Sequence, residues 1–172
     1  MTRYAVVAAR FNARETEGLL AGCLASLKAA GVRGDQIRVV RVPGAFELPL
    51  VAQTLAKTGR YDAVICLASV IRGDTAHFDL VAGECARGIA RVSLETGLPV
   101  IFGVVTANTR AQAAARCAYP SSARQKRGKT IRNRGEEAAE AAVEMASLLG
   151  QEASDGRSTQ SPGLRAADSV RR

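Results

Sequence analysis

Short apolar blocks separated by longer amphipathic segments recur along most of this chain. Three blocks of mainly apolar residues, at 4–9, 63–70 and 100–105, are typical of strands that are buried on both faces of a sheet. Residues 37–42 alternate apolar side chains with arginine, which is the pattern of a more exposed strand. The hydrophobic pattern therefore predicts four short strands.

Helical spacing fills the segments between these strands. Apolar residues recur at intervals of three and four from Leu19 to Leu27, and this segment stops at Gly31. A short helix that carries Arg116 is predicted after residues 106–109. The other predicted helices cover residues 50–58, 76–96 and 136–149, and they end at Gly59, Gly97 and Gly150.

Regular alternation of strand and helix predicts an α/β fold with a four-stranded, mostly parallel sheet that helices flank on both faces. Ligand sites of such sheets lie beyond the carboxyl ends of the strands. With 172 residues, 47% of them hydrophobic, the chain is expected to form one domain over residues 1–150. Residues 151–172 are rich in Ser, Gly and Arg and are expected to be a disordered tail.

Composition argues against several classes of protein. No apolar stretch approaches the roughly 18 residues of a membrane span, and no targeting presequence is evident, so we expect a cytoplasmic protein. The four cysteines lack metal-binding spacing and the chain has one histidine, which disfavours a zinc site. Cys23, Cys66 and Cys85 lie among aliphatic neighbours, so we interpret them as small buried hydrophobic residues.

The net charge of +8 is concentrated in one segment. Between residues 124 and 134 every charged side chain is basic. All of these residues except Arg134 fall in what we interpret as a basic insertion loop at 118–132. Nucleic acid is not favoured as a partner, because the chain has no Trp and only 4% aromatic residues with which to stack bases. We favour a solvated surface insertion; the alternative is multivalent binding of an anionic partner by an assembly.

Two loops after predicted strands carry candidate ligand-binding groups. Phe11 follows the first strand, where its ring can stack on a planar heterocycle or plug the top of the core. The loop after the second strand holds Pro43, Gly44 and Pro49, which favour an irregular, rigid backbone. Glu47 lies among apolar residues there, so its carboxylate either binds a polyhydroxy ligand or serves as an ordinary acid at a helix N-terminus.

The segment 69–78 after the third strand is the most informative one. Gly73 permits a tight turn, and Asp74 and Thr75 mark a helix start, whose free N–H groups suit a phosphate. The sole histidine, His77, follows within the first turn, where an imidazole can transfer protons. We expect His77 and Arg116 to face one cleft there, with Arg116 as a phosphate clamp rather than a solvated helix residue.

Taken together, these motifs resemble the lumazine synthase family. They are RFN at 10–12, VPGAFE at 42–47, VIRGDTAHF at 70–78, PVIFGVVT at 99–106 and NRG at 133–135. Several long motifs in the same order are more specific than any one of them. The chain departs from the family in its longer, basic connection at 117–132 and in Arg134, which replaces the family's usual lysine.

The resemblance implies a flavodoxin-like three-layer sandwich that forms homopentamers, or icosahedral shells of pentamers, with active sites between subunits. The implied proton-transfer residue is His77, and Phe102 would close the pocket from the adjacent subunit. The implied phosphate-binding residues are Asp74, Thr75 and Arg116. The implied pyrimidine and ribityl contacts are Phe11, Ala45, Phe46, Glu47, Ser69, Val70, Ile71, Phe102 and Arg134.

The implied activity belongs to riboflavin biosynthesis. A ribitylaminopyrimidine would condense with a four-carbon ketone phosphate to give 6,7-dimethyl-8-ribityllumazine, without any metal or redox cofactor. The resemblance also makes riboflavin synthase a candidate partner. Two alternatives are a non-catalytic shell or ligand-binding relative, and a generic phosphate-binding flavodoxin-like domain.

Overall fold

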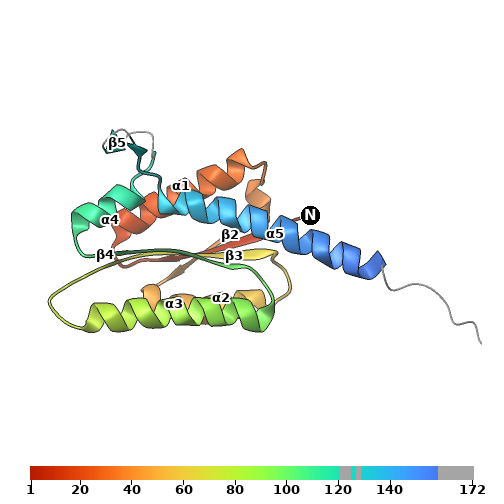
Figure 1. Cartoon of the computed structure of the whole chain (residues 1–172), viewed down its shortest axis with the longest axis horizontal. Coiled ribbons are helices and arrows are strands. Elements are labelled where there is room, and N and C mark those ends of the chain that lie inside the picture. Colours follow the sequence, from red (N-terminus) through yellow and green to blue (C-terminus); the bar gives the residue numbers. More distant parts are fainter. Residues whose placement is uncertain (121–124, 127–128, 159–172) are drawn as a thin grey trace, which may run out of the picture.

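A parallel four-stranded sheet forms the centre of the molecule (Figure 1). The computed structural model describes residues 1–120, 125–126 and 129–158. The strands are β1 (Tyr4–Ala9), β2 (Ile37–Val42), β3 (Ala63–Ile71) and β4 (Val100–Ala107), in the order β2-β1-β3-β4. All four predicted strands are confirmed, and β3 and β4 run slightly further than expected. The exposed pattern of β2 is explained by its edge position, where it pairs only with β1.

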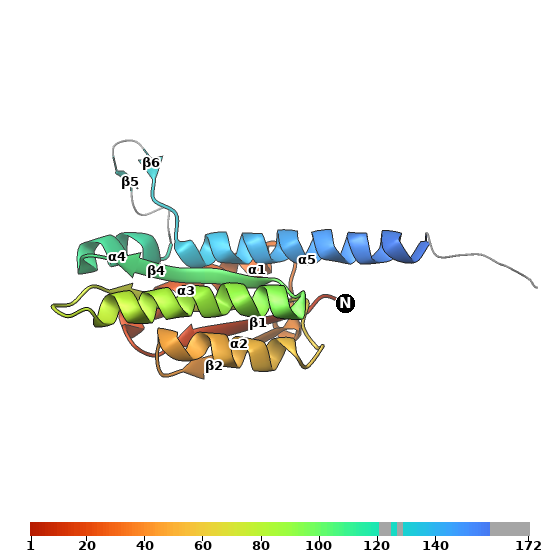
Figure 2. The same cartoon turned by 60° about the horizontal axis from the view of Figure 1, so that its bottom comes forward.

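Helices cover both faces of this sheet, as predicted (Figures 1 and 2). One face carries α1 (Ala13–Ala29), α4 (Arg110–Cys117) and α5 (Arg134–Ser158), and the other carries α2 (Leu48–Ala56) and α3 (His77–Thr96). Two short 3-10 helices, η1 (Gly34–Gln36) and η2 (Ala45–Glu47), precede β2 and α2. The architecture is therefore a three-layer α/β sandwich.

Strand residues alternate between two separate cores. Val6 and Ile65 point toward α1, α4 and α5, whereas their neighbours Val7 and Val64 point toward α2 and α3. All four of these side chains are fully buried. Burial on both faces is the reason why β1 and β3 are continuous apolar runs.

Helix α5 extends beyond its predicted end. It passes through Gly150 and continues to Ser158, so the expected stop at Gly150 is wrong. Glycine in a helix interior costs only about 1 kcal/mol relative to alanine, and the Ser154 hydroxyl donates a hydrogen bond of 2.9 Å to the Gly150 carbonyl. The first eight residues of the expected disordered tail are thus helical, and residues 159–172 lie outside the described residues.

The basic insertion contains regular structure in its described part. Strands β5 (Gln125–Lys126) and β6 (Lys129–Thr130) form a two-stranded antiparallel sheet, separate from the central one, rather than an irregular loop. Residues 121–124 and 127–128 of this insertion lie outside the described residues. None of the helices described for this chain is long and apolar enough to cross a membrane.

Asn133 joins three helices at one buried point. Its side-chain amide donates to the carbonyl oxygens of Gly18, Cys117 and Ala118 at 2.8–3.0 Å. Its Oδ1 atom accepts the N–H of Gly135 at 2.7 Å and so caps the start of α5. The helices approach closely there, since a Cβ on Gly18 would lie 2.1 Å from the Cys117 carbonyl oxygen. Asn133 therefore provides hydrogen-bond partners for backbone groups at the end of α4 and at the start of α5.

We predict that Asn133→Ala lowers the free energy of unfolding by about 2–4 kcal/mol, because it removes a helix cap and leaves buried carbonyls without donors. Urea denaturation measures the change. Gln151→Ala, on the exposed part of α5, is the control and should shift stability by less than about 0.5 kcal/mol. If Asn133→Ala lowered the free energy of unfolding no more than the control does, the hydrogen bonds of Asn133 would not contribute to stability.

The four cysteines are all free and buried, which confirms and extends the interpretation of three of them as small hydrophobic residues. Burial raises the pKa of the Cys23, Cys85 and Cys117 thiols to about 12. It also raises the pKa of Cys66, with a further contribution from Cys85. These thiols are therefore protonated and poorly nucleophilic at neutral pH.

We accordingly predict that the folded protein reacts very slowly with a chromogenic disulfide reagent at pH 8, because the attacking thiolate is scarce and inaccessible. All four thiols should react promptly once the protein is unfolded in guanidinium chloride. Rapid release of even one equivalent of chromophore from the native protein would contradict this expectation.

Candidate functional site

A cavity of about 770 Å³ opens beyond the carboxyl ends of β1, β2 and β3. Three chain segments that follow these strands meet there, as expected for a parallel sheet. The lining residues are Phe11, Asn12, Pro43, Gly44, Ala45, Phe46, Glu47, Ser69, Val70, Ile71, Gly73, Thr75, His77, Phe78, Leu80 and Val81.

The turn after β1 presents an aromatic ring at the cavity. Phe11 is 72% exposed, so it does not plug the core. Its N–H donates to the Pro43 carbonyl oxygen at 3.0 Å. Asn12 adopts a left-handed conformation with a φ of 52°, and its side-chain amide donates to the Ser69 carbonyl oxygen at 2.8 Å. This turn is thereby tied to the segments that follow β2 and β3.

The connection between β2 and α2 orients a carboxylate. Glu47 ends the short helix η2, and its Oε2 atom accepts the N–H of Gly44 at 2.8 Å. The Glu47 side chain thus has a partner in its own loop while it lines the cavity with the 58% exposed Phe46. Of the two interpretations left open for Glu47, the local capping contact is observed, and the ligand contact stays a prediction.

The turn after β3 leads directly into the 20-residue helix α3. Asp74 and Thr75 are exposed, and the Thr75 hydroxyl oxygen lies 3.4 Å from the His77 N–H, which donates to it. His77 is the first residue of α3 and lines the cavity, as expected. The exposed turn and the imidazole therefore lie at one opening.

Ser69 lines the cavity, but its hydroxyl is buried beside the Cys117 thiol, which does not line the cavity. Its hydroxyl has no hydrogen-bond partner of good geometry within the described part of the chain. The Ser69 hydroxyl lowers the pKa of the nearby Cys117 thiol, but burial of that thiol has the larger effect and raises its pKa. A buried hydroxyl without a firm partner is costly unless a ligand or water satisfies it.

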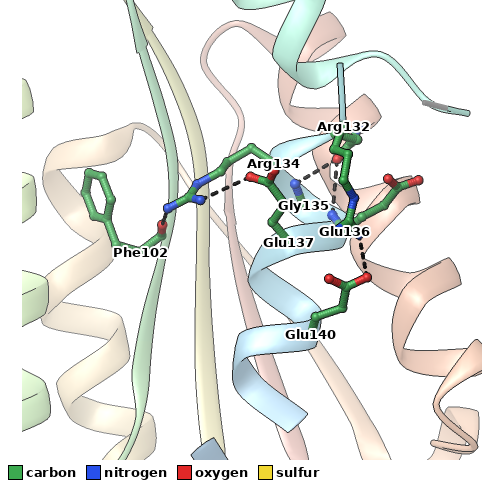
Figure 3. A network of polar contacts seen from close by, with 8 residues as sticks. Phe102, Arg132, Arg134, Gly135, Glu136, Glu137 and Glu140 are labelled. Carbon is green, nitrogen blue, oxygen red and sulfur yellow. Dashed lines mark hydrogen bonds and ion pairs between the residues drawn. The ribbon is translucent and has the colours of Figure 1, made fainter. Parts of the chain in front are cut away.

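Three predicted site residues lie away from this cavity. Arg116 is exposed in the last turn of α4 and does not line the cavity, so the expectation that it faces this cleft is not met within one chain. Phe102 lies on β4, and its carbonyl oxygen accepts Arg134 Nη2 at 3.2 Å (Figure 3). Arg134 also pairs with Glu137 at 3.1 Å. Phe102 and Arg134 thus form a second, separate group.

Of the predicted set, Asp74 also does not line the cavity, although its neighbours Gly73 and Thr75 do. The structure brings together the nine others, namely Phe11, Ala45, Phe46, Glu47, Ser69, Val70, Ile71, Thr75 and His77.

Sequence reasoning missed a polar network next to the turn after β3. Arg72 forms a two-pronged ion pair with Asp79, with Nη1–Oδ2 at 2.9 Å and Nη2–Oδ1 at 2.6 Å. Its Nε atom donates to Asn108 Oδ1 at 3.1 Å, and its guanidinium lies 4.2 Å from the centre of the Phe78 ring. The hydrogen bonds from Arg72 hold the pKa of the Asp79 carboxyl below its usual range. No spacing rule for strands or helices links residues 72, 79 and 108.

One comparison with known proteins identifies the family of the chain. The family model for 6,7-dimethyl-8-ribityllumazine synthase matches residues 1–150. The match includes all four strands of the central sheet and every residue that lines the cavity. It agrees with the resemblance seen in the sequence motifs. The chain therefore belongs to the family of 6,7-dimethyl-8-ribityllumazine synthases, transferases of riboflavin biosynthesis.

Proposed function

We propose that this protein condenses 5-amino-6-(ribitylamino)uracil with 3,4-dihydroxy-2-butanone 4-phosphate to form 6,7-dimethyl-8-ribityllumazine, and releases phosphate and water. The observation that carries the proposal is the shared cavity. It holds an exposed aromatic ring, an oriented carboxylate and a histidine at the start of a long helix. These are the groups that the two substrates need.

The pyrimidine and its ribityl chain match the part of the cavity after β1 and β2. The exposed Phe11 ring offers a flat apolar face for stacking on the heterocycle. The Gly44 N–H orients the Glu47 carboxylate, which can accept hydrogen bonds from ribityl hydroxyls. Ser69, Val70 and Ile71 line the cavity at the end of β3, where their backbone can contact a polar ring edge.

The ketone phosphate matches the turn after β3. The first N–H groups of a helix lack partners within that helix, and the helix dipole adds positive potential at this end. Asp74 and Thr75 precede the 20-residue helix α3, and the Thr75 hydroxyl adds a donor. A phosphate bound here would lie beside His77.

The chemistry requires little beyond positioning and proton transfer. The pyrimidine's amine attacks the ketone carbonyl, and water leaves as the imine forms. Phosphate is then eliminated, and ring closure expels a second water. His77 can move protons in these steps, while the cavity holds the two substrates in contact.

We further propose that a second copy of the chain completes the site. Phe102, Arg116 and Arg134 do not line the cavity of their own chain, so the roles that the resemblance assigns to them require a neighbouring subunit. On α3, Leu80 and Leu94 are 63% and 87% exposed, which suits a face that another subunit covers. By the family resemblance we propose a homopentamer in the cytoplasm, with riboflavin synthase as a candidate partner.

The deciding experiment mixes the purified protein with both substrates and records lumazine fluorescence and released phosphate. The proposal expects equimolar lumazine and phosphate. A folded protein that produces neither, yet binds the pyrimidine, would instead be a non-catalytic relative.

We predict that His77→Ala lowers kcat by about 10²–10⁴-fold without abolishing turnover, because a positioned proton-transfer group contributes about that much. His77 is exposed, so folding should be unchanged. Lys57→Ala, an exposed change at the end of α2, is the control. Complete loss of turnover in a folded variant would show that His77 does more than transfer protons.

We also predict that Phe11→Ala weakens pyrimidine binding by about 5–150-fold, the equivalent of about 1–3 kcal/mol of lost stacking. Isothermal titration with the pyrimidine measures this loss. Phe11→Tyr keeps the ring and should bind nearly as well as the original protein. Equal affinities for all three proteins would exclude stacking on Phe11.

A further inference from the structure

We propose that Arg72 is a positioning residue that braces the phosphate-binding turn from behind and thereby sets the affinity for the ketone phosphate, without binding the phosphate itself. This inference rests on the proposed function. It assigns a role to a side chain that neither lines the cavity nor belongs to the predicted site.

The first argument is the way in which Arg72 closes the turn. Its backbone N–H donates to the Ala107 carbonyl oxygen at 2.8 Å, so the residue is still held by the sheet. Its guanidinium grips both carboxylate oxygens of Asp79, in the first turn of α3. The residues on either side of the turn 73–76 are therefore held together by a planar, two-pronged ion pair.

Two further contacts extend the brace to the surroundings. Nε donates to Asn108, whose own N–H donates to Gln112 Oε1 at 2.8 Å in the capping box of α4. The guanidinium also lies against the ring of Phe78, which lines the cavity. One side chain thus couples the turn, the cavity wall and the connection that leads into α4.

The charge balance explains why Arg72 braces the turn rather than clamps the phosphate. Nε, Nη1 and Nη2 all have protein acceptors, and Asp79 compensates the positive charge. The same ion pair neutralises the Asp79 carboxylate, which would otherwise repel a phosphate at the start of α3. Removal of Arg72 would therefore loosen the turn and expose the phosphate to a negative charge.

Exposure separates this role from a general contribution to folding. The side chains of Arg72 and Asp79 are 41% and 58% exposed. Ion pairs in such positions are screened by water and add little to global stability. The effect of breaking the pair should therefore be local to the turn.

The test is steady-state kinetics of the full-length protein, in which each substrate is varied in turn. Arg72→Lys keeps the charge but loses the planar fork. We expect the KM for the butanone phosphate to rise about two- to fivefold, which is what the loss of one exposed, water-screened contact is worth. The KM for the pyrimidine and the urea midpoint should stay unchanged. Arg87→Lys, in the exposed Arg87–Glu84 pair on α3, is the matched control and should leave both KM values unchanged.

A second measurement does not depend on turnover. Hydrogen exchange of the backbone amides at 73–77 should be faster in Arg72→Lys than in the unmodified protein, with other segments unchanged. If the unmodified protein forms no lumazine, the proposed function is wrong. In that case the hydrogen-exchange rates at 73–77 alone test whether Arg72 stabilises the turn. Unchanged exchange at 73–77, an unchanged phosphate-substrate KM, or an equal rise in both KM values would each overturn the role of Arg72.

Discussion

The parallel pairing of β1 with β2 on one side and β3 on the other is the constraint on which the site depends. Parallel strands end at the same edge of the sheet, so the segments that follow them are brought together there. Phe11, Glu47 and His77 come from three such segments and are far apart in the sequence. Because β1 and β3 are buried on both faces, the register that sets these positions is tightly held.

Rigidity at this edge comes from hydrogen bonds between the connections rather than from the strands alone. The turn after β1 is tied to Pro43 and Ser69, and Glu47 is held by Gly44. A site that assembles two substrates gains rate from groups that are already in place. Since each of these contacts involves at least one backbone atom and is already formed, little conformational freedom has to be lost when substrates bind.

The motifs and the hydrophobic pattern of the sequence predicted most of the fold and most of the residues that line the cavity. The strands were predictable because apolar runs bounded by loops have few alternatives, and the cavity residues were predictable because they follow those strands. The end of α5 could not be predicted, because a glycine ends a helix only where the backbone leaves the helical conformation. At Gly150 the helix continues, and the Ser154 hydroxyl donates a hydrogen bond to the Gly150 carbonyl oxygen. The Arg72 network was also hidden, because its partners meet only after folding.

The amino-acid sequence by itself determined the layers of the fold, the family, and which side chains stand at the carboxyl ends of the strands, because all three follow from local periodicity and contiguous motifs. The tertiary structure alone decided which of those side chains share a cavity, and it separated Phe102, Arg116 and Arg134 from that cavity. It also decided that Asn133 joins three helices. The physical reason is that such contacts depend on how close distant segments of backbone approach, which no local pattern encodes.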